Sequence, residues 1–218
     1  ATGAYWMSRA SSITKRLDAA WAVGTNQGGL DTGSIANADY YIWQIARSDT
    51  GVVDVLFSAS STAPTMPANY DYKRLIGWFK RVSAAIVAFK TWQTAGGGLA
   101  FRWSTVTLDV NQANQPTITE RLDAVKVPLN FETDALVRVS MVDSASTFLA
   151  AVYSPDENIS AMSTTAAPLV NILRDSGGTT AVAELVVRTD SNGQIAAQAN
   201  STLDNYYVVT IGFDWERR

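Results

Sequence analysis

A chain of 218 residues, 47% hydrophobic and with a formal net charge of −3, is long enough to bury one substantial core or two small ones. Its calculated isoelectric point near 4.9 argues against a surface built for nucleic acid, because phosphate contacts need a concentrated basic face. Cysteine and histidine are both absent, which excludes disulfides, thiolate metal sites, cysteine nucleophiles and ordinary serine triads. We therefore expect a protein without catalysis or cofactors.

The composition also favours strands over helices. The chain holds 14 Gly and 6 Pro, and its charged fraction is 17%, which suits many short strands joined by polar turns. A helix bundle would need more Leu, Glu and Lys. The longest apolar run, residues 84–89, is far shorter than the roughly 20 residues that cross a bilayer. We expect no membrane insertion and no signal peptide.

The first clear elements lie between residues 40 and 79. Side chains alternate in character along residues 40–47, pause at the turn-forming residues 48–51, and alternate again along residues 53–58. This pattern predicts a β-hairpin. Residues 58–69 contain two prolines among small polar residues, so an extended loop is expected there. A third strand is expected to follow it, up to about residue 79.

These same residues carry a resemblance. The blocks LDTGSIANA, TGVVDVLFS, APTMPANY and RLIG, in that order, resemble a segment that recurs in virion proteins of tailed bacteriophages, mostly tail-fibre, collar or appendage proteins. The likeness runs from about residue 13 to residue 79 and returns at residues 211–214. Where such proteins often have Trp-Tyr-His, this chain has Tyr40-Tyr41-Ile42, so any role of that histidine is absent. The resemblance implies a virion protein made in the host cytoplasm.

Strand patterns continue beyond residue 79 with little sign of helix. Residues 82–92 and 99–108 predict a second hairpin-like pair across Gly96–Gly98, and residues 109–116 predict a turn or loop. Further strands are expected at residues 117–127, 135–142, 147–153, 169–174, 180–189, 193–199 and 206–213. Residues 154–167 fit a short helical turn or a loop equally well.

This spacing of short strands predicts an all-β fold, an antiparallel β-sandwich with a jelly roll as one version of it. No linker rich in Gly, Ser or Pro divides the chain, so residues 1–218 are expected to form a single domain. Residues 1–12 are a candidate extended N-terminal arm.

Charged residues offer three alternative sites. Lys73-Arg74 and Lys80-Arg81 flank an apolar stretch, and we interpret them as the charged ends of a buried strand in preference to a base-stacking platform. A glycosidase would need two carboxyl groups held roughly 5 to 9.5 Å apart. The candidates are more simply turn or solvent-facing residues: Asp54, Asp109, Asp123, Glu132 and Asp134.

A calcium loop is the third alternative. Residues 190–193 begin like one, but Ile195 stands where the turn glycine belongs and Ser201 where the glutamate belongs. We predict instead a hairpin turn at Asn192-Gly193 between residues 184–188 and 194–199, and no metal site.

Aromatic side chains are the better binding candidates, because exposed rings stack on sugars or anchor protein interfaces. Trp43, Phe57 and Trp103 lie inside alternating patterns and are expected to be buried. The recognition candidates lie nearer to loop boundaries: Tyr70, Tyr72, Trp78 and Trp92.

From the residues and the resemblance together we expect a non-enzymatic structural component of a phage virion, a tail-fibre or appendage protein that takes part in host attachment. Its expected partners are itself, as a homotrimer by analogy with fibre-like proteins, other virion proteins and a host-surface glycan. Nucleic acid is not an expected partner. Two alternatives stay open: a capsid or neck protein that contacts only other virion subunits, and a polysaccharide depolymerase.

Overall fold

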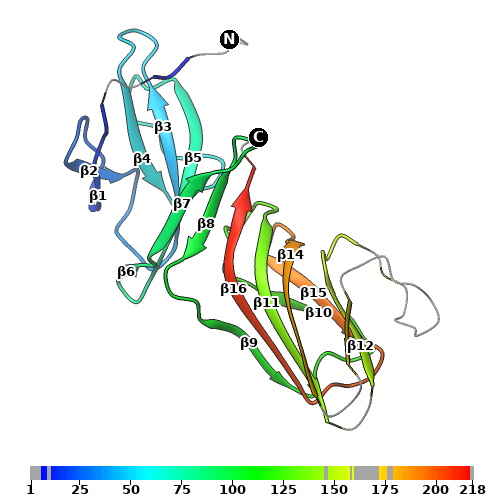
Figure 1. Cartoon of the computed structure of the whole chain (residues 1–218). Coiled ribbons are helices and arrows are strands. Elements are labelled where there is room, and N and C mark those ends of the chain that lie inside the picture. The colour runs from blue at the N-terminus through cyan, green and yellow to red at the C-terminus, as the bar shows by residue number, and fades with distance from the viewer. Residues whose placement is uncertain are drawn as a thin grey trace. The chain divides into compact units, whose positions relative to one another are not determined.

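The computed structural model describes residues 6–8, 11–144, 147–157, 159, 172–175 and 179–216. Within these residues the regular structure consists of β-strands, mostly antiparallel, in three sheets, and no helix occurs (Figure 1). The all-β, sandwich-like class predicted from side-chain alternation is confirmed.

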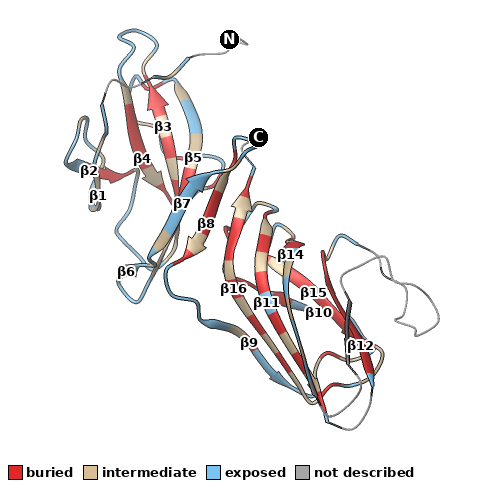
Figure 2. Ribbon diagram, in the orientation of Figure 1, coloured by how far each residue is buried: buried red, intermediate tan, exposed pale blue. Residues whose placement is uncertain are grey.

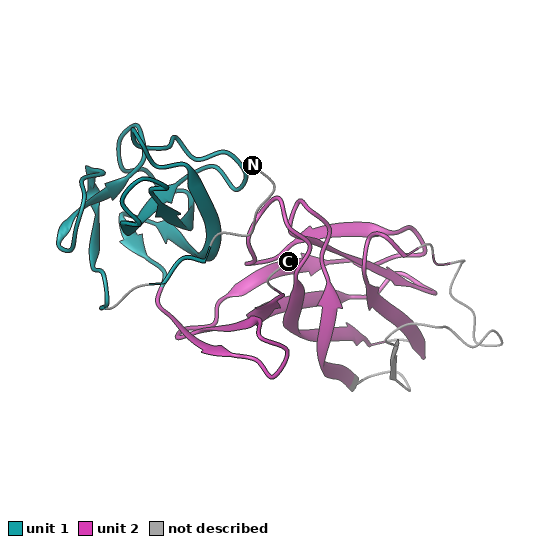
Figure 3. Ribbon diagram, turned by 90° about the horizontal axis from the view of Figure 1, so that it is seen from above, with its two compact units in different colours: residues 1–87 teal, residues 88–218 magenta. Residues whose placement is uncertain are grey.

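The chain divides into two compact units, residues 1–87 and 88–218, where one domain was expected (Figure 3). The boundary falls in a short connection between neighbouring strands, so no run of Gly, Ser or Pro marks it in the sequence. Composition alone could not reveal a division without a linker. Of residues 1–12, those described lie outside any strand.

Unit 1 is built on one mixed sheet with strand order β1-β2-β4-β3-β5-β6. Its strands are β1 (Lys15–Ala20), β2 (Gln27–Leu30), β3 (Asp39–Ala46), β4 (Val53–Ser58), β5 (Tyr72–Val82) and β6 (Ala85–Ile86). The predicted hairpin is confirmed as β3 and β4, and the predicted loop after β4 leads to β5, which pairs with the other side of β3. The pairs β1-β2 and β2-β4 are parallel.

The core of unit 1 follows from the alternation along its central strands. Tyr41, Trp43 and Ile45 are buried on β3, and Trp78 is buried at the middle of β5 (Figure 2). The lysine–arginine pairs lie on either side of that buried centre, which confirms that they are the charged ends of a strand.

Unit 2 contains two sheets. The larger has the order β14-β11-β16-β8-β7, and β9 also pairs with β16. Its strands are β7 (Phe89–Gln93), β8 (Leu99–Trp103), β9 (Leu108–Ala113), β11 (Asp134–Asp143), β14 (Thr179–Arg188) and β16 (Asn205–Trp215). The smaller has the order β10-β15-β12-β13, formed by β10 (Arg121–Ala124), β12 (Phe148–Tyr153), β13 (Ile172–Asp175) and β15 (Gln194–Ala199). The pair predicted at residues 82–92 and 99–108 is confirmed as β7 and β8 over narrower bounds, since β7 begins only at Phe89 and β8 ends at Trp103.

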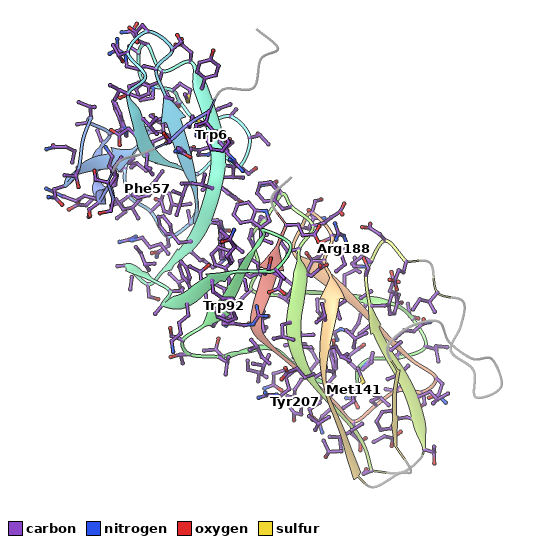
Figure 4. The ribbon with its side chains drawn as sticks, turned by 45° about the horizontal axis from the view of Figure 1, so that its top comes forward. Trp6, Phe57, Trp92, Met141, Arg188 and Tyr207 are labelled. Atoms are coloured by element: carbon purple, nitrogen blue, oxygen red, sulfur yellow. The ribbon has the colours of Figure 1, made fainter. Side chains whose placement is uncertain are left out.

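The core of unit 2 also alternates. Val137, Val139 and Met141 are fully buried on β11, and on β16 Tyr206 and Val208 are fully buried (Figures 2 and 4). Strand β12 differs, because every one of its side chains is buried. Ile159 packs against a cluster of Ala151, Tyr153 and Ala196, so both faces of this strand are covered.

Two predictions for unit 2 are wrong. Residues 109–116 were expected to form a turn or loop, but most of them belong to β9. Pairing with β16 overrides the low strand propensity of this Asn-containing segment, and Val110 packs inward opposite Val208.

The second error concerns residues 190–193. The chain does reverse there, with Gly193 at a φ of 70°, but β14 and β15 belong to different sheets and do not form a hairpin. An Asn-Gly turn reverses the chain equally well between two strands of a hairpin and between strands of two different sheets. Ser154–Glu157 form a turn, while most of the segment 154–167 and residues 169–171 of an expected strand lie outside the described residues.

Candidate functional site

Unit 1 contains a hollow of about 280 Å³ between two loops. One loop follows β2 and contributes Asp31, Thr32 and Ser34; the other follows β4 and contributes Ser60 and Thr65. Both loops come from the sequence blocks that carry the phage-protein resemblance. Segments separated in the chain by a whole hairpin therefore meet at one surface.

Asp31 ties these two loops together. Its Oδ2 accepts a hydrogen bond from the Thr65 backbone N–H (2.8 Å), and its Oδ1 accepts one from the Thr32 N–H (2.8 Å). The Asp31 N–H donates to the Phe57 carbonyl (2.9 Å). The loop is closed further along by Tyr40, whose hydroxyl accepts from the Ala36 N–H (2.9 Å) and donates to the Ala36 carbonyl (3.3 Å).

The hollow is lined by hydroxyl side chains and, over more of its accessible surface, by apolar groups that include Leu30 and four alanines. Thr32, Ser34, Ser58, Ser60 and Thr65 line it, and Asp31 is the charged residue among its lining. Hydroxyls both donate and accept hydrogen bonds, so this lining suits a neutral polar ligand. These residues were not among the predicted site residues. The only signal that could have located them was the order of the resembling blocks.

Replacing Asp31 with alanine is expected to loosen the loop that follows β4. The loss of the bond to Thr65 should cost about 1 kcal/mol locally and speed exchange of the Thr65 amide roughly fivefold. Hydrogen exchange followed by NMR measures this rate. The control is Ser34→Ala in the same loop, which leaves the Asp31 bonds in place; equal rates in the two variants would contradict the assignment.

The predicted recognition aromatics separate into buried and exposed groups. Trp78 is fully buried and Tyr70 is 8% exposed, so the prediction that these two lie at the surface is wrong. Tyr70 packs edge-on against Trp21, with ring centroids 5.1 Å apart. Tyr72 is half-buried at the start of β5. Tyr70 is buried because the end of the loop after β4 packs against Trp21, whereas Trp78 is buried because it lies at the middle of β5 and not at a loop boundary.

Trp92, which is labelled in Figure 4, lies on β7 and is 50% exposed. The guanidinium of Arg102 lies 5.4 Å from the centroid of its ring. Arg102 Nη1 is fixed in turn by the carbonyls of Phe101 (2.8 Å) and Phe213 (3.1 Å) and by Asp214 Oδ1 (2.7 Å). An aromatic side chain anchored in this way loses little freedom when a ligand stacks on it.

Three carboxylates expected in turns or at the surface are buried, which corrects that prediction. Each meets a cation: Asp54 meets Lys15 (3.0 Å), Asp109 meets Lys126 (2.9 Å) and Asp123 meets Arg121 (2.8 Å). Glu132 and Asp134 are partly exposed and both bind Arg188. All five carboxylates therefore form ion pairs within the structure.

The Lys15–Asp54 pair is the most deeply buried of these, with both side chains 1% exposed. Lys15 Nζ also donates to the Ala22 carbonyl (2.6 Å) and lies 5.1 Å from the centroid of the Trp21 ring. Asp54 Oδ2 accepts from the Gly24 N–H (2.9 Å). The pair therefore fastens β1 and the turn after it to β4.

The buried tyrosine beside Arg121 is not suited to proton transfer at neutral pH. Tyr206 is fully buried, and the Arg121 guanidinium lies 5.4 Å from its ring centroid. Burial, followed by the negative charge of Asp123, raises the pKa of Tyr206 well above its ordinary value. Its phenol stays protonated at neutral pH.

The turn at residues 190–193 uses its acidic side chain internally. Asp190 Oδ1 accepts from the N–H groups of Asn192 (3.0 Å) and Gln194 (2.7 Å), and Oδ2 accepts from the Asn192 side chain (3.0 Å). The described parts of the chain hold no group of three or more acidic side chains arranged for a metal ion. Nor do they include a helix long and apolar enough to span a membrane.

Scans of the chain against protein-family models, curated proteins and solved structures found no significant match.

Proposed function

We propose that this chain is a structural component of a tailed-phage virion, a tail-fibre or appendage protein that takes part in attachment to the host surface. One observation carries the proposal. The main run of resembling blocks, residues 13–79, falls within one compact unit, residues 1–87, and only the short block at residues 211–214 lies in the other unit. A short set of ordered blocks that folds as a unit is what a recurring module requires.

Two features support a role in contact with a glycan. The hollow of unit 1 presents both hydroxyl and apolar groups, and a sugar likewise has hydroxyl groups and apolar ring faces. Trp92 in unit 2 offers an exposed, pre-organised aromatic surface, and such surfaces stack on the apolar faces of sugar rings. Each feature belongs to its own unit, and each can be tested separately.

The virion assignment is tested by mass spectrometry and immunogold electron microscopy of purified particles from the phage that encodes the chain. We expect the chain in the particles and gold at the tail or its appendages. Gold at the neck or capsid would favour the protein that contacts only virion subunits. Absence of the chain from purified particles would refute the assignment.

Replacing Trp92 with alanine is expected to weaken binding of the purified protein to the host's isolated surface polysaccharide by about tenfold or more, because stacking on the indole is lost. Isothermal titration calorimetry measures the change. Trp6→Ala is the matched control, since Trp6 is 89% exposed and belongs to the other unit. Equal affinities of the two variants would remove Trp92 from the site. Release of reducing ends from the same polysaccharide would point instead to a depolymerase.

A further inference from the structure

Strand β14 is a long edge strand of the larger sheet in unit 2. It pairs with β11 over residues 179–188 without a register shift, and among the described residues it has no strand partner on its other side. Its outward face carries Val182 and Val186, each 60% exposed (Figure 2). A regular, apolar edge of this length presents unpaired backbone groups ready to pair with another strand.

The other edge strands of the described chain are protected. β6, β7, β10 and β13 have five residues or fewer, β1 carries Lys15, Arg16 and Asp18 together with an irregular register, and β9, which pairs with β16 alone among the described strands, has a register shift and carries Asp109. Short edges, charges and bulges are the devices that keep sheets from joining edge to edge. β14 is the longest edge strand of the described chain and pairs without a register shift, and its two charges, Glu184 and Arg188, leave residues 179–183 and 185–187 uncharged.

We infer that β14 pairs with β14 of a second copy of this chain, antiparallel and about a two-fold axis at Val186. Residues 184–188 of the two copies then lie side by side, and the larger sheets of the two copies become continuous. This inference does not depend on the proposed virion role.

The charges on β14 favour a second copy of β14 as its partner, and they favour a pairing register centred on Val186. Residues on the same face of a sheet must lie opposite one another, so even-numbered residues of one copy face even-numbered residues of the other. An axis at Val186 places Glu184 opposite the partner's Arg188, twice by symmetry, and sets the two Val186 side chains against each other. An axis at Glu184 would instead set two carboxylates face to face.

The neighbours of these charges extend the same pattern. Glu184 already binds Arg138 Nη2 (3.0 Å), and Arg188 already binds Glu132 (3.0 Å). The proposed contact therefore joins two surface ion pairs into a row of alternating sign across the axis. Networks of this kind contribute more than isolated surface pairs do.

A two-fold contact of this type is self-complementary and closes at two copies. It favours a dimer over the trimer expected from the sequence, which rested on analogy with fibre-like proteins. Light scattering on the purified chain would give twice the subunit mass of 23.5 kDa.

Cysteine cross-linking tests the register directly, because the chain has no cysteine of its own. Opposed residues of antiparallel strands have Cα atoms about 4.5–5.5 Å apart, which is within the range that a disulfide spans. Val186→Cys should form a disulfide-linked dimer under mild oxidation. Val182→Cys is the matched control, equally exposed on the same face but outside the paired residues, and should remain uncross-linked.

A second measurement tests the energetics. Val186→Lys would set two cations against each other at the axis, and should raise the dimer dissociation constant by about tenfold or more in analytical ultracentrifugation. Val182→Lys should change it by less than about threefold. Circular dichroism and thermal unfolding establish that both variants stay folded. A monomeric wild-type chain, cross-linking through Val182→Cys in place of Val186→Cys, or equal effects of the two lysines would each overturn the inference.

Discussion

Replacing Lys15 with methionine is expected to lower the free energy of unfolding of unit 1 by about 3–5 kcal/mol. Both side chains of the Lys15–Asp54 pair are 1% exposed, so the variant leaves the Asp54 carboxylate without its counter-ion in a buried place. The Gly24 and Val55 N–H groups still donate to Asp54, but they do not neutralise its charge. Hydrogen exchange of core amides in β3 under native conditions reports the stability of unit 1 separately from that of unit 2.

The matched control is the double variant Lys15→Met with Asp54→Leu. Removing both charges exchanges an ion pair for apolar groups, which is often close to neutral, so most of the lost stability should return. Arg16→Met is a second control, because Arg16 and its partner Asp18 are both 60% exposed. If Lys15→Met and Arg16→Met unfold with the same free energy, the buried pair does not stabilise the protein in the way described.

Replacing Phe213 with alanine is expected to destabilise unit 2 by about 3–5 kcal/mol, the range for truncating a buried aromatic side chain. Phe213 is fully buried on β16 and stacks on Phe101 with ring centroids 4.6 Å apart. Trp103 also lies near it, with centroids 6.4 Å apart. The variant would leave a cavity among rings that are held by two strands. Hydrogen exchange of β11 and β16 amides measures the change.

Tyr207→Ala on the same strand is the control for this prediction. Tyr207 is half-buried, and its neighbours on β16, Tyr206 and Val208, are the fully buried ones. Truncating Tyr207 should lower the free energy of unfolding by about 1 kcal/mol or less, because its side chain is only half-buried and its removal leaves no enclosed cavity. A cost for Tyr207→Ala as large as that for Phe213→Ala would mean that the two faces of β16 are not differently buried.

Much of the fold follows from local pattern. The β3–β4 hairpin, the loop after β4 and the buried centre of β5 were all predicted from alternation, turn residues and prolines. These signals act over a few residues, so they survive in a single sequence. The errors arose where the outcome depends on a distant partner, as for β9, which is a strand because β16 lies beside it.

The candidate site was harder to predict. Trp92 is exposed as expected, but Tyr70 is buried by the side chain of Trp21, and Trp78 is buried because it lies at the middle of β5. The hollow of unit 1 was not predicted, because the two loops that form it are separated in the sequence by the β3–β4 hairpin. By itself, the sequence of each loop indicates only a polar turn.

By itself the sequence determined that this protein is built of strands, that it has no thiol or imidazole chemistry, and where most strands lie. Alternation and residue type are properties of a few neighbouring positions, and they do not need the fold. Only the tertiary structure decided which strands share a sheet, that the chain forms two units, that Lys15 meets Asp54, and that β14 is left at an edge. Those outcomes depend on contacts between residues far apart in the chain, and the free energies of these contacts cannot be inferred from the pattern of a few neighbouring residues.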